Sequence, residues 1–200
     1  QMSVARKALN AWSAVANVSF VEVTESSTDV GDMRFAISSL PPTAWAYYPG
    51  ASAEGGDVWL GRNTYFNSAE DGSYSLLGLM HEIGHALGLK HPHDTDGSGV
   101  LLPVNLDYLG NTVMSYRSYV NQQIGGPYTN TFYPTTLGVY DIAALQYLYG
   151  ANASTNAGNT TYQWLSGEQI LETIWDGGGS DTIDWSNQTT VAEINLTAGV

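Results

Sequence analysis

Hydrophobic residues recur at helical spacing in three segments of the chain. Over residues 73–87 and 136–149, apolar side chains return every three or four positions, and Gly88 and Gly150 follow as typical helix ends. Residues 4–15 show the same spacing near the start. The pattern therefore predicts three amphipathic helices, each of which needs a partner for its apolar face.

Shorter segments alternate apolar and polar residues with a period of two, as half-buried strands do. These segments are residues 18–23 and 33–37, and residues 44–48 and 57–60 are further predicted strands. The polar, glycine-rich stretch 90–134 is too long for an ordinary connection, which indicates a functional or mobile region. Beyond residue 150 the chain is rich in Asn, Thr and Gly, so we place a domain boundary within 150–158. Together the helices and strands predict an α+β fold.

Composition narrows the functional classes. The 200 residues are 43% hydrophobic and 12% aromatic, which indicates a globular protein. Nineteen acidic against six basic side chains give a net charge of −13, which disfavours nucleic acids and anionic membranes as partners and suits calcium binding. The absence of cysteine excludes a thiolate nucleophile and Cys-ligated zinc. No apolar run reaches the roughly 18 residues that a membrane span requires.

The candidate chemistry lies at the end of the second predicted helix. His81 and His85 are four residues apart, about 40° around a helix axis, so both rings can bind one metal ion. Glu82 points at a different angle and can reach a metal-bound water without being a ligand. Gly88 permits a turn that brings back His91 as a third nitrogen ligand. Three imidazoles leave a fourth position open, which is typical of catalytic zinc.

Each histidine also has a plainer interpretation. A pair four residues apart is, by itself, more often a surface coincidence than a metal site, and only the combination with Glu82, Gly88 and His91 favours the metal. His93 lies two residues past His91 in a Pro–Asp context, and we expect it to be exposed to solvent.

The histidine pattern, followed by Thr112-Val113-Met114-Ser115-Tyr116, resembles the metzincin zinc peptidases. Pro92, directly after the third histidine, is similar to the serralysin group, whereas astacins have Glu there. The resemblance implies that Met114 underlies the zinc site. It also implies that Tyr116 ligates zinc or swings away to stabilise the oxyanion. Taken alone, Met114 would more often be an ordinary core methionine.

This resemblance extends over nearly the whole chain and implies its fold. Residues 1–150 resemble a metzincin catalytic domain with a twisted, mostly parallel sheet, an active-site helix and a C-terminal helix. Residues 151–200 resemble the first turns of a calcium-binding β-roll of the RTX type. Because the chain starts inside a predicted helix and holds only the beginning of such a roll, we expect it to be trimmed at both ends.

A glycine-rich motif occupies 176–184. Acidic side chains separated by glycines let carboxylates and main-chain carbonyls converge on Ca²⁺, although a solvated loop is the commoner outcome for such a motif alone. The resemblance implies one or more structural calcium ions held between two loops. The expected ligands are Asp176, Gly178, Gly179 and Asp181, together with Asn156, Gly158 and Thr160.

The resemblance implies a secreted zinc endopeptidase of broad specificity. Zinc would activate a water, Glu82 would act as general base, and Tyr116 would help to stabilise the oxyanion. We expect the substrate to lie extended along an edge strand, because main-chain pairing reads peptide backbone without demanding a sequence. The residues concerned are Ala44, Trp45, Ala46 and Tyr47. The aromatic side chains near this strand fit the core equally well.

Two alternative functions stay open at this point. One is a catalytically inactive adhesion module that binds calcium and zinc, although the intact Glu82 stands against it. The other is a metzincin of narrow specificity, similar to astacins or matrixins. The expected partners are protein or peptide substrates and a proteinaceous inhibitor, with the chain a monomer. Its acidity, its lack of cysteine and the resemblance favour export to the extracellular space by a signal beyond Val200.

Overall fold

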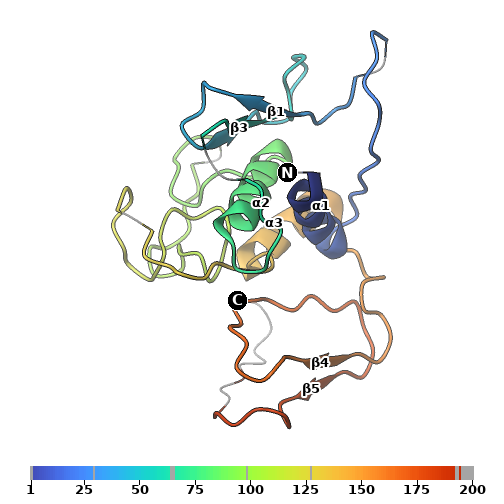
Figure 1. The fold of residues 1–200 in the computed structure, drawn as a ribbon, viewed down its shortest axis with the longest axis vertical. Coiled ribbons are helices and arrows are strands. Elements are labelled where there is room, and N and C mark those ends of the chain that lie inside the picture. Colours follow the sequence, from blue (N-terminus) through green and yellow to red (C-terminus); the bar gives the residue numbers. More distant parts are fainter. Residues whose placement is uncertain are drawn as a thin grey trace.

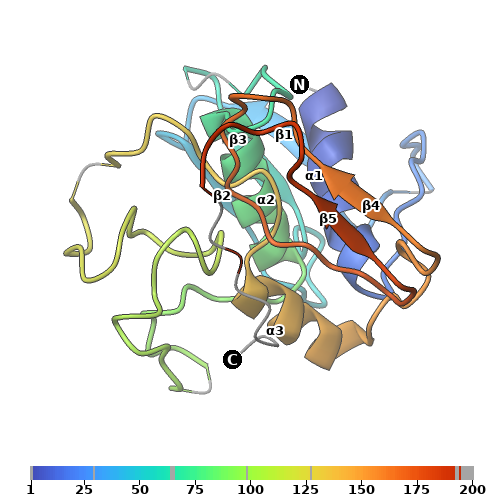
Figure 2. The same cartoon turned by 90° about the horizontal axis from the view of Figure 1, so that it is seen from below.

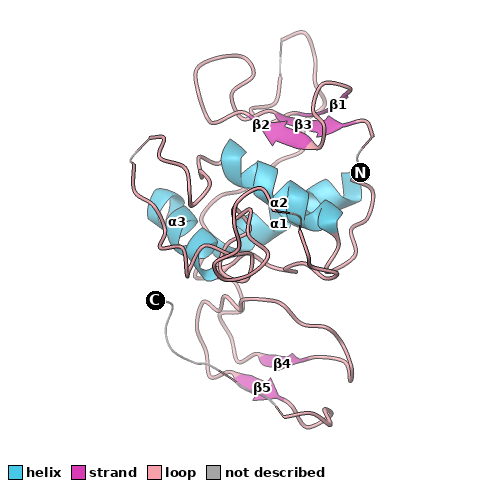
Figure 3. Cartoon of the chain, turned by 90° about the vertical axis from the view of Figure 1, so that its left-hand side faces the viewer, coloured by secondary structure: helices cyan, strands magenta, loops and turns pink. Residues whose placement is uncertain are grey.

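The computed structural model describes residues 2–28, 30–63, 66–97, 99–126, 128–191 and 194. Three helices form the middle of the molecule, with a small sheet on one side and two short strands on the other (Figure 1 and Figure 3). The helices are α1 (Met2–Val15), α2 (Tyr74–Ala86) and α3 (Val139–Tyr149). The strands are β1 (Phe35–Ser38), β2 (Ala44–Ala46), β3 (Val58–Gly61), β4 (Thr161–Gln163) and β5 (Thr182–Asp184).

The helices lie where the hydrophobic spacing predicts them, with small differences at their ends. α2 begins behind Ser73, whose hydroxyl accepts a hydrogen bond from the Leu76 amide (3.2 Å) and so satisfies a free helix donor. After α2 the chain turns at Gly88, where φ is +102°. α3 begins three residues later than predicted, because the Asp141 carboxylate accepts a hydrogen bond from the Gly138 amide (2.8 Å) and caps the helix there.

The main core forms where α1 packs against α2. Trp12 of α1 is fully buried, and its indole N–H donates to the Met80 carbonyl of α2 (3.0 Å). Truncating a buried tryptophan to alanine costs on the order of 3–5 kcal/mol, so this contact contributes much of the helix pairing. Leu76, Leu79 and Ile83 complete the buried face of α2. α2 is thereby held rigidly beneath the sheet.

The sheet is small and mixed. Its order is β1-β3-β2, with β1 parallel and β2 antiparallel to β3, so that β2 lies at an edge. The expectation of a mostly parallel sheet is therefore corrected: the described strands form one parallel and one antiparallel pair. The segment 18–23 is extended but belongs to no strand among the described residues. Its Val21 and Val23 are 82% and 47% exposed, because no buried surface faces them.

The C-terminal residues form a small unit below the helices. Its strands β4 and β5 pair in parallel, and Figure 2 shows them in front of α1. The unit is attached to the end of α1, where Thr155 donates to the Ala14 carbonyl (2.6 Å) and Asn152 donates to the Ser13 carbonyl (2.8 Å). In the described part of the chain, no helix combines the length and apolar character that membrane crossing requires.

Candidate active site

The end of α2 and the turn after it bring three histidines together. His81 and His85 lie on one face of the helix, as their spacing predicts. The Leu89 amide donates to the Gly84 carbonyl (2.9 Å), which closes the helix and turns the chain back on itself. Because of this turn, the ring of His91 lies 4.5 Å from the ring of His85.

The three rings point one nitrogen at a common centre. Their Nε2 atoms are 3.0–3.2 Å apart in every pair. Each Nδ1 faces an acceptor: the Val113 carbonyl for His81 (2.8 Å), the Leu89 carbonyl for His85 (2.7 Å) and the Asp94 carboxylate for His91 (2.6 Å). Carbonyl and carboxylate oxygens can only accept, so each Nδ1 carries the proton. In the neutral rings the Nε2 atoms then present three lone pairs to one another, an arrangement that a bound cation stabilises.

The donor set fits zinc. Three nitrogens bound to one tetrahedral zinc at about 2.0–2.1 Å lie roughly 3.3 Å apart, close to the separations observed. Burial, aided by the neighbouring imidazoles, lowers the pKa of His81 and lowers that of His85 to about 4, so both rings are neutral ligands at pH 7. An acceptor behind each Nδ1 is the usual support of metal-binding histidines.

Glu82 lies beside the histidines in an apolar setting. The residue is 9% exposed, and this burial raises its pKa to about 7. A carboxyl group that titrates near neutral pH can both accept and return a proton. Glu82 lines the same cleft as His81 and Tyr116.

The segment that contains Met114 packs beneath α2. Met114 is 2% exposed, and its sulfur lies so close to Gly84 that a Cβ on that glycine would come within 2.5 Å of it. The preceding residues are held by the buried Asp141, whose carboxylate accepts from the Thr112 hydroxyl (2.6 Å) and the Val113 amide (2.7 Å). The carbonyl of the same Val113 accepts a hydrogen bond from His81. The Asp141 carboxylate therefore supports the candidate metal site indirectly, through Val113.

Tyr116 covers the histidine cluster from one side. Its ring stacks on His81 at a centroid distance of 5.5 Å and lies 4.3 Å from the ring of His91. Burial, and to a smaller extent the charge of Glu82, raises the pKa of Tyr116 to about 12. Its hydroxyl is therefore protonated at pH 7 and is available as a hydrogen-bond donor.

The expectation that His93 is exposed to solvent is wrong. Its side chain is only 13% exposed, because its ring stacks on that of His91 (5.2 Å, 7° between planes). On the other side its Nδ1 faces the buried Asp107 carboxylate at 3.7 Å. Nothing in the local sequence signals this burial, since Asp107 comes from the later part of the loop.

A cleft of about 390 Å³ opens beside these residues. Ala44 at the start of the edge strand β2 lines it, as does Gly78 of α2. Three aromatic side chains that sequence reasoning did not single out also line the cleft: Phe66, Tyr74 and Tyr128. Tyr48, at the other end of the β2 segment, places its ring 5.5 Å from His85. Trp45 and Ala46 lie within β2, and Tyr47 follows directly and is 42% exposed.

The two loops expected to bind calcium lie side by side before β4 and β5. The Thr160 amide donates to the Asp181 carboxylate (3.0 Å), and the Gly178 amide donates to the Asp176 carboxylate (2.8 Å). A Cβ on Gly179 would come 2.5 Å from the Gly158 carbonyl oxygen. Asn156, with φ of 52°, donates from its side chain to Tyr162. The seven expected ligand residues are thus contributed by two adjacent turns.

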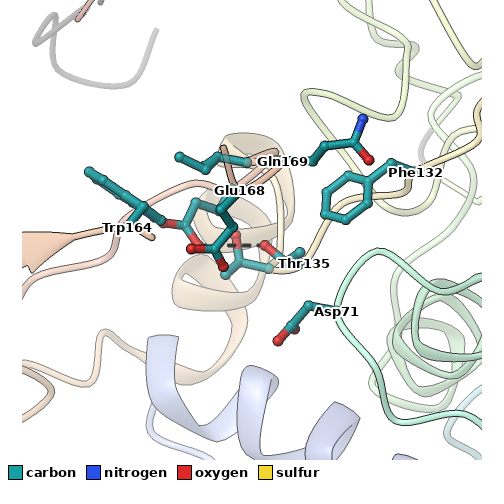
Figure 4. Close-up of a pocket in the computed structure, with 9 residues that line it drawn as sticks. Asp71, Phe132, Thr135, Trp164, Glu168 and Gln169 are labelled. Carbon is teal, nitrogen blue, oxygen red and sulfur yellow. Dashed lines mark hydrogen bonds between the residues drawn. The ribbon is translucent and has the colours of Figure 1, made fainter. Parts of the chain in front are cut away.

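A second hollow, of about 350 Å³, lies between the loops that precede α2 and α3 and the C-terminal unit (Figure 4). Asp71 and Phe132 line it from one side, and Trp164 and Glu168 line it from the other. The Trp164 indole N–H donates to Glu172 (2.5 Å). No histidine lines this hollow, so its chemistry differs from that of the cleft.

Comparison with known proteins identifies relatives of this site. A family model described as Matrixin matches residues 1–105, and a second model, described as Met-zincin, matches residues 77–170. Metallopeptidase AprA of Pseudomonas marginalis is 37% identical over 98% of this chain and 46% of its own length. Serralysin C of Dickeya chrysanthemi is 34% identical (100% and 46%), and serralysin of Proteus mirabilis is 33% identical (100% and 47%).

The chain spans a little under half the length of these curated relatives. The Matrixin match covers more than half of the chain and includes all three clustered histidines. The Met-zincin match covers α2, the Met114 segment and α3. The chain therefore belongs to the matrixin family and is a metzincin of the serralysin type.

Proposed function

We propose that the protein is a zinc-dependent endopeptidase that hydrolyses peptide bonds in protein substrates. The observation that carries this proposal is the convergence of three Nε2 atoms, on His81, His85 and His91, beside the buried Glu82. The relatives named metallopeptidase and serralysin support the same activity.

The chain's own residues divide the chemistry among them. The three histidines would hold zinc, which would supply a Lewis acid and a bound water of lowered pKa. Glu82 takes the proton of the attacking water, for which its raised pKa suits it, and delivers that proton to the leaving amine. Tyr116 donates its hydroxyl hydrogen to the oxygen of the scissile carbonyl as negative charge develops there.

The edge strand β2 is proposed to bind substrate in an extended conformation. Among the described residues β2 pairs with β3 along one side only, so its other side offers backbone donors and acceptors to a peptide. Ala44 and Glu82 line the same cleft, which supports a substrate backbone bound at β2 within reach of the proton acceptor. Contacts through Ala44, Trp45, Ala46 and Tyr47 are mainly to backbone, which favours broad specificity.

The apolar part of the cleft is proposed to receive a side chain of the substrate. This part of the cleft, beside His81, is lined by Phe66, Leu77, Gly78 and Tyr128. Glycine at position 78 is required because a Cβ there would come 2.6 Å from the ring of Phe66. Aliphatic and aromatic side chains fit such a lining best.

The C-terminal unit is proposed to be a separate domain from residue 151 onward that binds structural calcium. Support comes from two adjacent turns that contribute Asp176 and Asp181 together with several backbone carbonyls, which is the oxygen-rich environment that Ca²⁺ prefers. The relatives named serralysin support secretion of the whole protein, which is likewise a proposal here.

Metal removal and restoration tests the activity. The chain is incubated with casein in excess calcium, before and after extraction of zinc by 1,10-phenanthroline, and again after zinc is added back. We expect cleavage to disappear with the zinc and to return with it. Cleavage that persists in zinc-free protein would contradict the proposal. Loss of zinc without any cleavage by the zinc-loaded chain would favour a binding module instead.

A further inference from the structure

A buried carboxylate lies behind the segment that carries Tyr116. Asp107 is 1% exposed, and it contacts both residues that flank the tyrosine. The Ser115 hydroxyl donates to one of its oxygens (2.5 Å), and the Arg117 Nε donates to the other (2.9 Å). The two oxygens of one side chain therefore hold the chain on either side of Tyr116.

Additional hydrogen bonds fix the same stretch of backbone. The Arg117 amide donates to the Ser115 hydroxyl oxygen (3.0 Å), and the Leu109 amide donates to the Arg117 carbonyl (2.8 Å). The Arg117 guanidinium also donates to the Gln122 carbonyl. Ser115 and Arg117 are 0% and 8% exposed, whereas Tyr116 between them is 38% exposed. A partly exposed ring is thus mounted between two buried and anchored neighbours.

The geometry gives this anchoring a consequence for the active site. The ring of Tyr116 lies 4.3 Å from that of His91 and 5.5 Å from that of His81. Its hydroxyl is at the far end of a rigid side chain, so a small rotation of the backbone moves the oxygen by a larger distance. A displacement of about 1 Å in a reacting group can lower a rate by about 10²-fold.

We propose that Asp107 is a positioning residue that sets the ring of Tyr116 over the histidine cluster. Asp107 acts on both sides of the tyrosine, and it also faces His93, whose ring stacks on that of His91, at 3.7 Å. The two hydrogen bonds on either side of the tyrosine make Tyr116 the direct route for its effect on hydrolysis. Loss of that effect in a protein without the Tyr116 hydroxyl separates this route from one through His93. The effect on rate rests on the proposed peptidase function, whereas the placement of the ring is a property of the metal-free chain.

A double-mutant cycle tests the effect on rate. Asp107→Asn keeps the shape of the side chain but replaces one carboxylate oxygen by an NH₂ group. This NH₂ group faces either the Ser115 hydroxyl or the Arg117 N–H and cannot accept a hydrogen bond from it. We expect Asp107→Asn to lower kcat for a peptide substrate by about tenfold or more, with KM and zinc content unchanged. In a Tyr116→Phe background, where the hydroxyl is already absent, Asp107→Asn should lower kcat no further. An equal reduction in both backgrounds would overturn the proposal.

A measurement on the zinc-free protein tests the placement without relying on activity. The protein is produced with ring-labelled tyrosine, and the NMR signal of Tyr116 is identified as the one that Tyr116→Phe removes. The neighbouring imidazoles shift this signal, and we expect Asp107→Asn to move it towards that of a free tyrosine. An unchanged signal in folded Asp107→Asn protein would overturn the proposal even if the peptidase activity were established.

Two further variants keep the test decisive if Asp107→Asn does not fold. Ser115→Ala removes one of the two contacts to Asp107 and leaves the pair with Arg117 in place, so it should move the Tyr116 signal in the same direction. Asp57→Asn disrupts another ion pair of a buried aspartate, with Arg34 (2.6 Å), directly before β3 and should leave the signal in place. A shift in the Asp57→Asn control as large as that in Ser115→Ala would contradict a specific role for Asp107.

Discussion

The acceptors behind the three histidines differ in kind. His81 and His85 donate to main-chain carbonyls, whereas His91 donates to the side chain of Asp94 at 2.6 Å. A carboxylate acceptor makes the opposite ring nitrogen more basic and fixes its orientation. Since substitution can remove a side chain but not a main-chain carbonyl, Asp94 is the place where this support can be tested.

Asp94→Asn is expected to weaken zinc binding by about 10–100-fold, because an amide is a poorer acceptor for the His91 N–H. The dissociation constant is measured by competition with a chromophoric zinc chelator. Asp96→Asn, an exposed change in the same loop, serves as the matched control and should leave the constant unchanged. Equal affinity in Asp94→Asn and the parent would show that this contact does not support the metal.

Tyr116→Phe tests the proposed oxyanion donor. Removing the hydroxyl should lower kcat by about 10²-fold or more, the range found when one such donor is lost, with little change in KM. Steady-state kinetics on a defined peptide, with zinc content checked in both proteins, gives the answer. An unchanged kcat would assign the stabilisation of the oxyanion to other groups.

At the scale of residues, sequence reasoning located those that follow one another on a helix. The spacing of His81, Glu82 and His85 follows from the helical period, and Gly88 indicated the turn towards His91. The supporting residues Asp107 and Asp141 could not be found in this way. They reach the site across a long loop and from another helix, and no periodic pattern connects them to the histidines.

At the scale of elements, α2 and the Met114 segment are in very close contact. A Cβ on Gly84 would come 2.5 Å from the Met114 sulfur and 3.1 Å from the Trp12 ring. Gly84→Ala should therefore lower the free energy of unfolding by about 1–3 kcal/mol, even though alanine favours helix. Urea unfolding gives the value. Gly50→Ala, where the nearest atom is 3.9 Å away, should be close to neutral, and equal effects would contradict the packing argument.

The buried Asp141, which links α3 to the Met114 segment, predicts that the stability of the fold depends on pH. Complete burial raises the pKa of Asp141 from its ordinary 3.8 to about 6, against the opposing effect of donors such as Thr112 and Val113. The folded chain thus binds this proton more tightly than the unfolded chain. The resulting stability is present below about pH 4 and is lost as the pH rises through about 6.

Comparison with Asp141→Asn isolates this titration. Raising the pKa of Asp141 from 3.8 to about 6 corresponds to about 3 kcal/mol in the free energy of unfolding. The free energy of unfolding of the zinc-free parent should therefore fall by on the order of 2–3 kcal/mol relative to the variant between pH 4 and pH 7. A difference between the two proteins that stays constant across this range would show that the Asp141 carboxyl is ionised throughout.

Helices were easier to predict than strands. A helix of three turns repeats its pattern several times, whereas β1 to β3 have only three or four residues each. Alternation in residues 18–23 resembles a strand, but a strand also needs a partner, and local sequence does not reveal one. The same limit explains the mixed sheet, since pairing direction depends on contacts between segments distant in the chain.

At the scale of the whole molecule, we expect calcium bound to the C-terminal unit to raise the thermal stability of the protein. Added Ca²⁺ should raise the melting temperature of calcium-free protein, because an ion that binds only the folded state stabilises it. Asp181→Asn should weaken this effect, whereas Asp32→Asn, an exposed change of equal charge elsewhere, should not. A melting temperature insensitive to calcium would remove the proposed site between the two turns.

The central claim is that three histidines and Glu82 together form a hydrolytic zinc centre. The most direct test is the rate of casein cleavage by the parent and by Glu82→Gln, with bound zinc quantified in both proteins. The account predicts one zinc in each and a rate at least about 10²-fold lower in the variant, since the proton acceptor alone is lost. Equal cleavage by the two zinc-loaded proteins would contradict it.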